Sequence, residues 1–327
     1  MARRGGLGAD DQGGFDRPRK HSRPRTKERP DYFGAPTARI VTVDRGRYRC
    51  LLDNGTLVTA TKARVIGRKG VIVGDVVTLD GDTSGSEGTL ARIVEVAERR
   101  TILRRSADDA DTFERPIVAN ADQLMIVTAL ADPEPRMGMI DRILVAAFDA
   151  KVSPILCLTK ADLASPDELI AAYQPLDVPI ITTRPGSDLA AVHSILTDHT
   201  TVLVGHSGVG KSTLVNALVP GINRAVAEVS DLTGKGRHTS TSALAIPLPQ
   251  GGWIVDTPGV RSFGISHVKT SSIVAAFGDL TEFAEQCPRG CHHQTGAEGC
   301  ALDEAVADGR LDHLRLASFR RMERAFI

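Results

Sequence analysis

The chain has 327 residues, enough for two or three domains, and its formal net charge is zero. Hydrophobic residues make up 42% and charged residues 24% of the sequence, so most of the chain can bury a core. No apolar run approaches the roughly 18 residues of a membrane span, and the N-terminus lacks the apolar region of a secretory signal. We therefore expect a cytoplasmic protein without a membrane partner, whose five cysteines form no disulfide framework.

The first 30 residues differ in composition from the rest of the chain. They contain nine Arg and Lys residues against four Asp and Glu residues, many Gly and Pro residues, and almost no large apolar side chains. Such a segment cannot bury enough surface to offset the entropy lost on ordering. We expect residues 1–35 to be a disordered basic arm, which either binds an anionic polymer or serves only to keep the protein soluble.

Short β-like runs follow at residues 40–43, 48–52, 57–60, 71–79 and 90–96, separated or interrupted by turn signals such as Asp53-Asn54-Gly55 and Gly74-Asp75. Five short strands in about 65 residues predict a small closed barrel of the OB type over residues 36–112. Such barrels often bind RNA. Tyr48 is the lone candidate for base stacking, so contact with a folded RNA backbone fits better. The basic residues of this region are Arg45, Arg47, Arg49, Lys62, Arg64, Arg68 and Lys69.

From residue 117 onward, apolar runs alternate with helical patterns. The runs lie at residues 124–130, 155–158, 178–181 and 202–204, and the clearest helical pattern covers residues 139–150. This rhythm predicts an α/β domain with a mostly parallel sheet over residues 113–265, with a hairpin of residues 243–248 and 253–256 at one edge. Past about residue 266 the pattern is helical and charged, which predicts a small, mostly helical domain over residues 266–327.

Residues 205–213 match the phosphate-binding loop pattern, and a strand-like run precedes them while a helical pattern follows. Glycines let backbone N–H groups turn inward around phosphate oxygens, and the helix N-terminus adds partial positive charge. Lys211 is expected to reach the β- and γ-phosphates, and Ser212 to hold Mg²⁺. The alternative is a Gly-rich turn that opens an ordinary helix. The predicted nucleotide-binding residues here are Gly205, His206, Ser207, Gly208, Val209, Gly210, Lys211, Ser212 and Thr213.

A second motif, Asp256-Thr257-Pro258-Gly259, closes another apolar strand. A carboxylate at the end of a strand can hold Mg²⁺ through water, and the N–H of Gly259 can sense a γ-phosphate. The same tetrapeptide also makes a good turn. Its position 44 residues after Ser212 favours the nucleotide interpretation, with Asp256 as a magnesium residue.

A third motif, Thr159-Lys160-Ala161-Asp162, resembles the Asn-Lys-x-Asp sequence by which GTPases read guanine. Asp162 would accept hydrogen bonds from the guanine N1–H and 2-amino group, which adenine does not present there. Lys160 would lie along the base plane, and Thr159 would make fewer hydrogen bonds than Asn. The alternative is a surface loop with ordinary charges. Residues 182–185 are a candidate second base-contacting loop.

The order of these motifs is unusual. In most GTPases the phosphate loop comes first and the base-reading motif last, whereas here base reading precedes the phosphate loop and Asp256 comes at the end. The elements are therefore circularly permuted, which a sheet tolerates when the old termini lie close together.

The hydroxyl-rich residues 233–242 have the composition of a mobile switch loop. Thr239, Thr241 or Ser240 is expected to reach Mg²⁺, and His238 is the candidate to position the attacking water. The alternative is a flexible loop without a catalytic side chain. Val260 stands where Ras-type GTPases place a water-orienting Gln, so we expect slow intrinsic hydrolysis that a partner accelerates.

Near the C-terminus, Cys287, Cys291, His293 and Cys300 are spaced Cys-x3-Cys-x-His-x6-Cys. Three thiolates and one imidazole suit one tetrahedral Zn²⁺ per chain, which would hold together a loop without a core of its own. His292 is the competing ligand, and free thiols are the alternative. The following helix is either a second RNA-facing surface or a solvated face, and its basic residues are Arg310, Arg315, Arg320, Arg321 and Arg324.

Taken together, residues 36–327 resemble the bacterial ribosome small-subunit-dependent GTPase A family of circularly permuted GTPases. The marks are residues 118–123 (Val-Ala-Asn-Ala-Asp-Gln), the phosphate loop, residues 234–239 (Gly-Lys-Gly-Arg-His-Thr), residues 256–264 and the Cys/His cluster. The resemblance implies an OB barrel, a permuted P-loop GTPase and a zinc-binding helical domain, with GTP or GDP, Mg²⁺ and one Zn²⁺ bound.

The same resemblance implies a monomer that binds the small ribosomal subunit and its rRNA during late maturation and hydrolyses GTP to GDP and phosphate when the subunit stimulates it. It also places His238 near the attacking water. A rival from another class is a non-hydrolysing RNA-binding scaffold that uses nucleotide as a structural ligand. Val260 is consistent with this rival, because valine can neither orient nor deprotonate water. An ATPase is disfavoured by Asp162.

Overall fold

The computed structural model describes residues 31–67, 70–106, 114–221, 243–257, 273–274 and 277–324. The chain divides into two units, Met1–Phe33 and Gly34–Ile327. Nearly all of the basic arm lies outside the described residues, so its disorder remains a prediction. Within the described part of the chain, no helix is long and apolar enough to cross a membrane.

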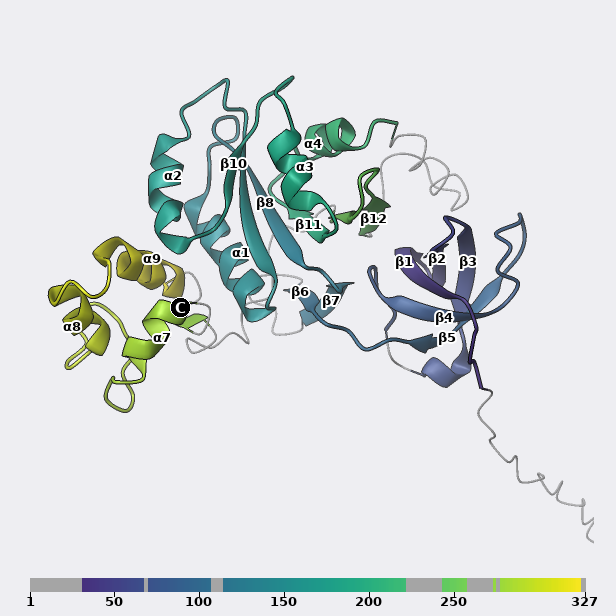
Figure 1. Ribbon diagram of the computed structural model, residues 1–327, viewed down its shortest axis with the longest axis horizontal. Helices are drawn as coiled ribbons and strands as arrows, with labels where there is room; N and C mark the ends of the chain where they lie inside the picture. Colours follow the sequence, from purple (N-terminus) through teal and green to yellow (C-terminus); the bar gives the residue numbers. More distant parts are fainter. Residues whose placement is uncertain are drawn as a thin grey trace, which may run out of the picture. The chain divides into compact units, whose positions relative to one another are not determined.

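Five strands near the N-terminus form the expected closed barrel (Figure 1). They pair in the order β1-β2-β3-β5-β4, and β4 pairs back with β1 to close the ring. Tyr48, the lone candidate for base stacking, is 7% exposed and packs in the barrel core, so it is not available for stacking. The elements are β1 Thr37–Asp44, β2 Arg47–Leu52, β3 Leu57–Lys62, the 3-10 turn η1 Arg64–Ile66, β4 Val76–Gly81 and β5 Ala91–Val96.

The fourth strand starts later than its apolar pattern suggests, at Val76 rather than at residue 71. The reason is the fully buried carboxylate of Asp75, which accepts a bond of 2.8 Å from the Ile72 N–H and pairs with Arg99 at 2.7 Å. Gly74 has a φ of +88°, and a Cβ there would lie 2.1 Å from the carbonyl oxygen of Ala119. The chain therefore turns at Gly74 and Asp75, and the strand begins after the turn.

A hairpin that the sequence analysis did not predict connects the barrel to the next domain. It consists of β6 Ile102–Ser106 and β7 Glu114–Ala119, which pair in antiparallel fashion. The predicted domain boundary at residues 112 and 113 falls outside the described residues. Directly after β7, the side chain of Asn120 donates to the Gly74 carbonyl at 3.0 Å and accepts from the Arg100 N–H at 2.9 Å. Asn120 thus joins the barrel, the connector and the start of the sheet.

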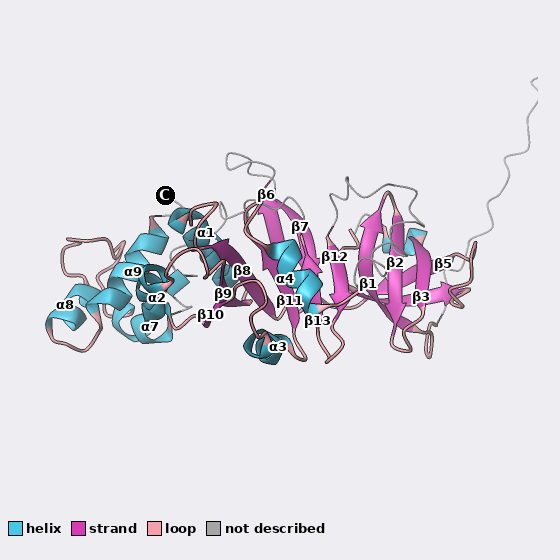
Figure 2. Cartoon of the chain, turned by 90° about the horizontal axis from the view of Figure 1, so that it is seen from above, coloured by secondary structure: helices cyan, strands magenta, loops and turns pink. Residues whose placement is uncertain are grey.

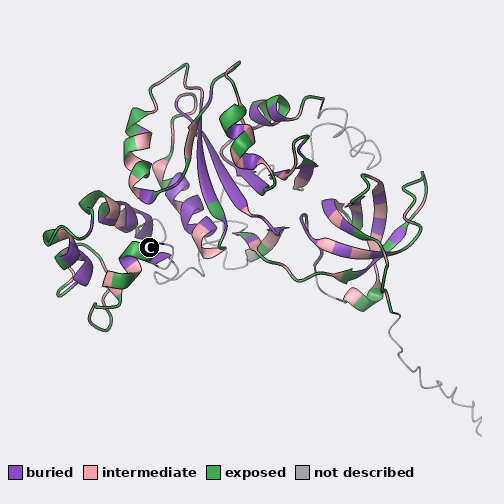
Figure 3. Cartoon of the chain, in the orientation of Figure 1, coloured by how far each residue is buried: buried purple, intermediate pink, exposed green. Residues whose placement is uncertain are grey.

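The α/β domain has the predicted mostly parallel sheet, in the order β10-β9-β8-β11-β13-β12, with β12 antiparallel. Alternate side chains of β8 explain the layers: Leu124 and Ile126 face the core under α1 and α2, and Met125 and Val127 face the core under α3 and α4 (Figures 1 and 3). The strands are β8 Gln123–Ala129, β9 Ser153–Thr159, β10 Ile180–Thr182, β11 Thr200–Val204, β12 Leu244–Pro247 and β13 Trp253–Asp256. The helices are α1 Met137–Asp149, α2 Asp167–Tyr173, η2 Gln174–Leu176, α3 Ala190–Leu196 and α4 Lys211–Leu218.

The predicted hairpin of β12 and β13 is present, but β12 is not a free edge. Its Leu244 pairs in antiparallel fashion with Thr42 of the barrel strand β1, so that the two domains share one sheet of eleven described strands (Figure 2). An unpaired edge strand would expose a row of N–H and C=O groups, and the barrel covers the start of that row at Leu244.

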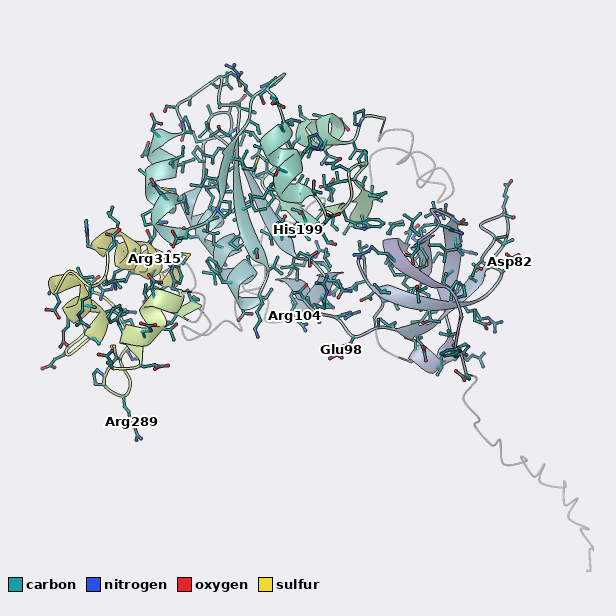
Figure 4. All side chains as sticks on the ribbon, in the orientation of Figure 1. Asp82, Glu98, Arg104, His199, Arg289 and Arg315 are labelled. Atoms are coloured by element: carbon teal, nitrogen blue, oxygen red, sulfur yellow. The ribbon has the colours of Figure 1, made fainter. Side chains whose placement is uncertain are left out.

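The C-terminal part of the described chain is helical, as expected, with α7 Gly278–Ala284, α8 Ala301–Ala307 and α9 His313–Glu323. Arg321 contacts the buried Asp141 of α1 at 3.0 Å, and Arg315 donates to the Pro175 carbonyl at 2.6 Å. Arg320 pairs with Asp303 of α8. Four of the five arginines considered for RNA contact, among them Arg315 (labelled in Figure 4) and Arg310, are thus paired with acidic groups within the protein.

Candidate nucleotide site and metal centre

The predicted nucleotide motifs gather at one edge of the sheet. β9 ends at Thr159, β11 leads into the phosphate loop after Val204, and β13 ends at Asp256. These strands run parallel, so their carboxyl ends meet at the same edge. Ligands of open α/β sheets bind in the crevice outside those ends. The permutation of the motifs along the chain therefore leaves their arrangement in space intact.

The phosphate loop has the backbone geometry of an anion nest. Gly208 and Gly210 adopt φ values of +83° and +91°, on either side of Val209, and Gly210 directly precedes the first residue of α4. A left-handed residue beside a right-handed one turns successive N–H groups toward one point. Gly205 approaches the neighbouring strand so closely that a Cβ would lie 2.1 Å from the Val127 carbonyl oxygen. The glycines are required by this geometry and not only by a turn.

Lys211 lies across the loop. Its Nζ donates to the carbonyls of Gly205 at 2.5 Å and His206 at 3.0 Å. Burial lowers the pKa of Lys211, and the Asp256 carboxylate opposes that shift. Burial likewise raises the pKa of Asp256, against the effects of Lys211 and of the Thr257 N–H. A cation and an anion thus stand together at the position where a phosphate and a metal ion would be bound.

Most of the remaining predicted residues of the phosphate loop are accessible. Ser207 and Gly208 are exposed, as are Ser212 and Thr213 in the first turn of α4, while Val209 is buried with 3% of its surface exposed. His206 is half-buried, and its Nδ1 lies 3.1 Å from the Ser207 carbonyl. The loop therefore presents polar groups outward while Val209 anchors it in the core between the sheet and α4.

The phosphate loop and the base-reading loop are bonded to each other. Thr159, 6% exposed, donates its hydroxyl hydrogen to the Val209 carbonyl at 2.6 Å, and its oxygen also lies 3.3 Å from the Thr128 carbonyl. A hydroxyl has one hydrogen, so the shorter contact takes it. The carbonyl and the following N–H of a trans peptide point in opposite directions. Holding the Val209 carbonyl therefore also sets the direction of the Gly210 N–H.

Lys160 and Asp162, the predicted base-reading residues, follow directly after the end of β9. Asp162 is exposed at the carboxyl edge of the sheet. Lys160 adopts a φ of +57°, and its Nζ donates to the carbonyl of Asp132. In the candidate second base-contacting loop, the Thr183 carbonyl accepts a bond from the Ala161 N–H at 3.1 Å, and the Thr183 N–H donates to the Leu158 carbonyl at 2.7 Å. Residues 182–185 and the base-reading loop are thus adjacent.

One wall of the site was missed by the sequence analysis. The β8–α1 loop supplies the carbonyl of Asp132 that holds Lys160, and the Cδ of Pro133 lies 3.7 Å from where a Cβ of Gly208 would be. This loop carries no recognisable nucleotide motif. Its position after a buried parallel strand was the available signal, because every such loop meets the same edge.

Several predicted residues lie outside the described part of the chain. They are Gly259, Val260 and the switch-loop residues His238, Thr239, Ser240 and Thr241, together with the whole of residues 233–242.

The four predicted zinc ligands do come together. One ligand atom from each of Cys287, Cys291, His293 and Cys300 lies within 4.8 Å of all the others. The Nδ1 of His293 is 3.5 Å from the Cys287 sulfur and 3.6 Å from the Cys291 sulfur. A tetrahedral zinc with Zn–S near 2.3 Å and Zn–N near 2.1 Å separates S and N by about 3.6 Å, so the donor set fits Zn²⁺. His292, the competing ligand, is exposed and outside the cluster.

Surrounding groups support this cluster. The N–H groups of Ala301 and His293 point at the sulfurs of Cys287 and Cys291, at 3.3 and 3.4 Å. Without metal, burial raises the pKa of Cys287 to about 11, and burial and the nearby Arg320 lower the pKa of His293. A neutral imidazole is the form that binds metal, and a bound cation would displace the thiol proton. Arg320 also donates to the His293 carbonyl at 2.7 Å, tying the loop to α9.

Comparison with known proteins agrees with this architecture. The RsgA GTPase family model matches residues 96–266. A protein of Azotobacter vinelandii called small ribosomal subunit biogenesis GTPase RsgA is 38% identical over 248 residues, covering 73% of this chain and 71% of the relative. A protein of the same name from Pseudomonas aeruginosa strain LESB58 is also 38% identical over 248 residues, covering 73% and 72%.

Solved structures show the same fold. YjeQ from Thermotoga maritima has a TM-score of 0.68 and 25% identity, covering 89% of this chain and 98% of YjeQ. YloQ, described as a circularly permuted GTPase, has a TM-score of 0.66 and 24% identity, covering 89% and 94%. With the phosphate loop, the permuted order and the Cys/His cluster in place, the chain belongs to the RsgA GTPase family.

Proposed function

We propose that this protein binds GTP with Mg²⁺ at the carboxyl edge of its sheet and hydrolyses it to GDP and phosphate while bound to the small ribosomal subunit, during the late maturation of that subunit. The observation that carries the proposal is the joint placement of the phosphate loop, Asp256 and the Thr159–Asp162 loop at one sheet edge. The relatives named small ribosomal subunit biogenesis GTPase support the choice of partner.

Each part of the site has a role in this proposal. The N–H groups of residues 208–213 and the Nζ of Lys211 bind the phosphates, while Asp162 and Lys160 select guanine. Ser212 and Asp256, with Thr239 or Thr241, would hold Mg²⁺, which neutralises charge on the phosphates. Gly259 would report the γ-phosphate. The protein therefore acts by positioning and electrostatics, because phosphoryl transfer requires little covalent chemistry from it.

We propose the barrel as the main RNA contact. Arg45 and Arg47 are exposed at the β1–β2 turn, and Arg64 is exposed on η1. Arginines at such positions can neutralise backbone phosphates without reading bases, which agrees with the buried position of Tyr48. Binding to the subunit should then weaken as salt rises, because counterions are released on association. One Zn²⁺ per chain holds the Cys/His loop, and the protein acts as a cytoplasmic monomer.

Steady-state GTP hydrolysis by the full chain, alone and with purified small or large ribosomal subunits, tests the proposal. We expect slow turnover alone, and an acceleration on the order of tenfold or more with small subunits but not with large ones. The rival function, a non-hydrolysing RNA-binding scaffold, predicts nucleotide binding with no turnover under any of these conditions. That result would overturn the proposal.

His238 is the residue we propose to place the attacking water. His238→Ala should leave GTP affinity within about twofold of wild type, because the phosphate loop is untouched, and should lower the subunit-stimulated rate about 100-fold, the lower end for a lost general base. His313→Ala, which alters an exposed histidine of α9, is the matched control. A His238→Ala protein with full stimulated turnover would show that backbone or RNA positions the water instead.

A further inference from the structure

The barrel and the nucleotide site are connected by a row of paired residues. Thr42 of β1 is the register partner of Leu244 in β12, Leu244 is the partner of Asp256 in β13, and Asp256 is the partner of Leu203 in β11. Neighbouring strands lie about 4.8 Å apart, so the barrel strand runs roughly 10 Å from the backbone of Asp256. Leu244 is separated by Ala243 alone from the hydroxyl-rich residues 233–242 in sequence.

A second contact joins the same barrel strand to the other end of β13. The guanidinium of Arg39 lies over the indole ring of Trp253, 5.1 Å from its centroid, and its NH1 is 3.4 Å from the Thr200 hydroxyl. Thr200 and Trp253 are themselves register partners at the starts of β11 and β13. Those two strands carry the phosphate loop and Asp256 at their far ends. Arg39 thus contacts the start of β13 directly, while Thr42 pairs with the β12 residue that lies opposite Asp256 at the end of β13.

The chemistry of Arg39 favours a specific role over a solvated charge. The side chain is half-buried, and this burial lowers its pKa, while the Asp122 carboxylate raises it and Arg100 lowers it further. An arginine remains protonated in proteins, so the cation is partly desolvated against the indole, where cation–π attraction is strongest. Asp122 accepts the Thr200 N–H at 2.8 Å and contacts Arg100 at 2.9 Å, so the anion facing Arg39 is itself held in place.

We propose that Arg39 is a positioning residue that couples the barrel to the nucleotide site, through its stacking on Trp253. A barrel held by RNA fixes β1, and β1 fixes β12 and β13 at the points where the predicted switch loop ends and where Asp256 stands. Arg39 touches neither nucleotide nor phosphate. Its loss should therefore alter stimulation without altering nucleotide binding. The inference rests on the proposed function for the identity of the partner, but the coupling itself can be measured without ribosomes.

The kinetic test compares Arg39→Ala with Arg92→Ala. Arg92 is an exposed arginine on β5 of the same barrel, so the control removes the same charge from the RNA-binding domain. For Arg39→Ala we expect the maximal subunit-stimulated rate to fall about 2- to 30-fold, the range for residues that couple two sites. Intrinsic turnover, GTP affinity and the subunit concentration for half-stimulation should match those of Arg92→Ala. Arg39→Lys, which keeps a cation, should restore part of the rate.

A double-mutant cycle tests the partner. Trp253→Leu should reproduce the loss seen in Arg39→Ala, and the double variant should lose no more than either alone, because both remove one contact. Additive losses would overturn the stacking contact as the cause. Full stimulation in Arg39→Ala, with wild-type stimulation present, would overturn the inference while leaving the proposed function intact.

Fluorescence measures the coupling without ribosomes. Trp253 is the single tryptophan of the chain, so tryptophan emission of the full-length protein reports on this contact alone. We expect emission to differ between the GDP complex and the complex with a non-hydrolysable GTP analogue, and the difference to be lost in Arg39→Ala but kept in Arg92→Ala. Wild-type emission that is the same with both nucleotides would overturn the inference even if small subunits stimulate hydrolysis.

Discussion

The phosphate loop and the Cys/His loop are both glycine-rich and both present ligand-binding groups, but their order has different sources. The phosphate loop lies between the buried strand β11 and α4, and Val209 anchors it in a core. The Cys/His loop lies between α7 and α8, and of its four ligands Cys300 alone is fully buried. The first loop is therefore formed before its ligand binds, whereas the second depends on the ligand for much of its stability.

This difference has a physical basis in where each loop's bonds go. In the phosphate loop, carbonyls are bonded by Thr159 and Lys211, and no ligand is needed to satisfy them. In the Cys/His loop, the atoms that approach one another are three sulfurs and an imidazole nitrogen, which gain most of their attraction from a shared cation. Removing a ligand group should thus affect binding in the first loop and folding in the second.

The largest effect is expected for Cys300→Ser. Zinc binding to such sites supplies about 10 to 16 kcal/mol in zinc-finger peptides, and a site lacking one thiolate forfeits much of it. The variant should lose its zinc and expose the amides of residues 287–300 to hydrogen exchange, while GTP affinity changes little. Metal analysis and exchange mass spectrometry measure both. His292→Ala, which alters the histidine outside the cluster, should keep one zinc per chain; freshly purified wild-type protein without zinc would contradict the assignment.

Lys211→Ala should have the reverse pattern. Truncating a partly buried cation that binds phosphate costs about 2 to 4 kcal/mol, so GTP and GDP should bind roughly 30- to 1,000-fold more weakly. Titration calorimetry measures the affinity. Zinc content and the protection of residues 287–300 should stay at wild-type values, because the hydrogen bonds of Lys211 go to Gly205 and His206 in the phosphate loop. Wild-type GTP affinity in this variant would remove Lys211 from the phosphate site.

Asp162→Asn tests the base side of the preformed loop. An amide cannot accept from both the N1–H and the 2-amino group of guanine, which costs about 1 to 3 kcal/mol, but it can donate to the 2-carbonyl of xanthine. The variant should therefore bind xanthosine triphosphate in preference to GTP in a competition assay. Asp167→Asn, on the following helix, is the matched control. An unchanged preference in Asp162→Asn would show that this carboxylate does not read the base.

The smallest effect is expected for Thr159→Val, which keeps the shape of the side chain but removes its hydroxyl. Losing one buried hydrogen bond to the Val209 carbonyl costs about 1 kcal/mol, so GTP and GDP should each bind about fivefold more weakly. Thr159→Ser retains the hydroxyl and should bind as wild type does. Equal affinity in Thr159→Val would mean that the phosphate loop holds its shape without this bond.

Local motifs explain why much of the site was predictable. The phosphate loop needs residues that are adjacent in sequence and a strand and helix on either side, so the pattern carries the structure with it. The zinc ligands likewise lie within fourteen residues. The predicted barrel, parallel sheet and helical C-terminal domain are confirmed because apolar periodicity reports burial within each element. In β8, for example, every residue from Gln123 to Ala129 is buried, as a strand with helices on both faces requires.

The roles that the sequence left open were decided by each residue's surroundings in the fold. Tyr48 has the aromatic ring of a base-stacking residue, but buried and outward-facing side chains alternate along β2, and Tyr48 is one of those in the barrel core. Arg315, Arg320 and Arg321 look like a basic face, but acidic partners far away in sequence, such as Asp141, engage them. The β6–β7 hairpin was missed because its strands are short and carry charged residues that mask the β pattern.

The sequence alone therefore indicated the chemistry of this protein: which loop matches the phosphate-binding pattern, which tetrapeptide resembles a guanine reader, and which four side chains suit zinc. Tertiary structure alone decided how these parts act on one another. The pairing of Thr42 with Leu244, the stacking of Arg39 on Trp253 and the bond from Thr159 to Val209 each join residues 50 or more positions apart. No local pattern encodes such contacts, because they exist only when the strands that carry them take their places in a common sheet.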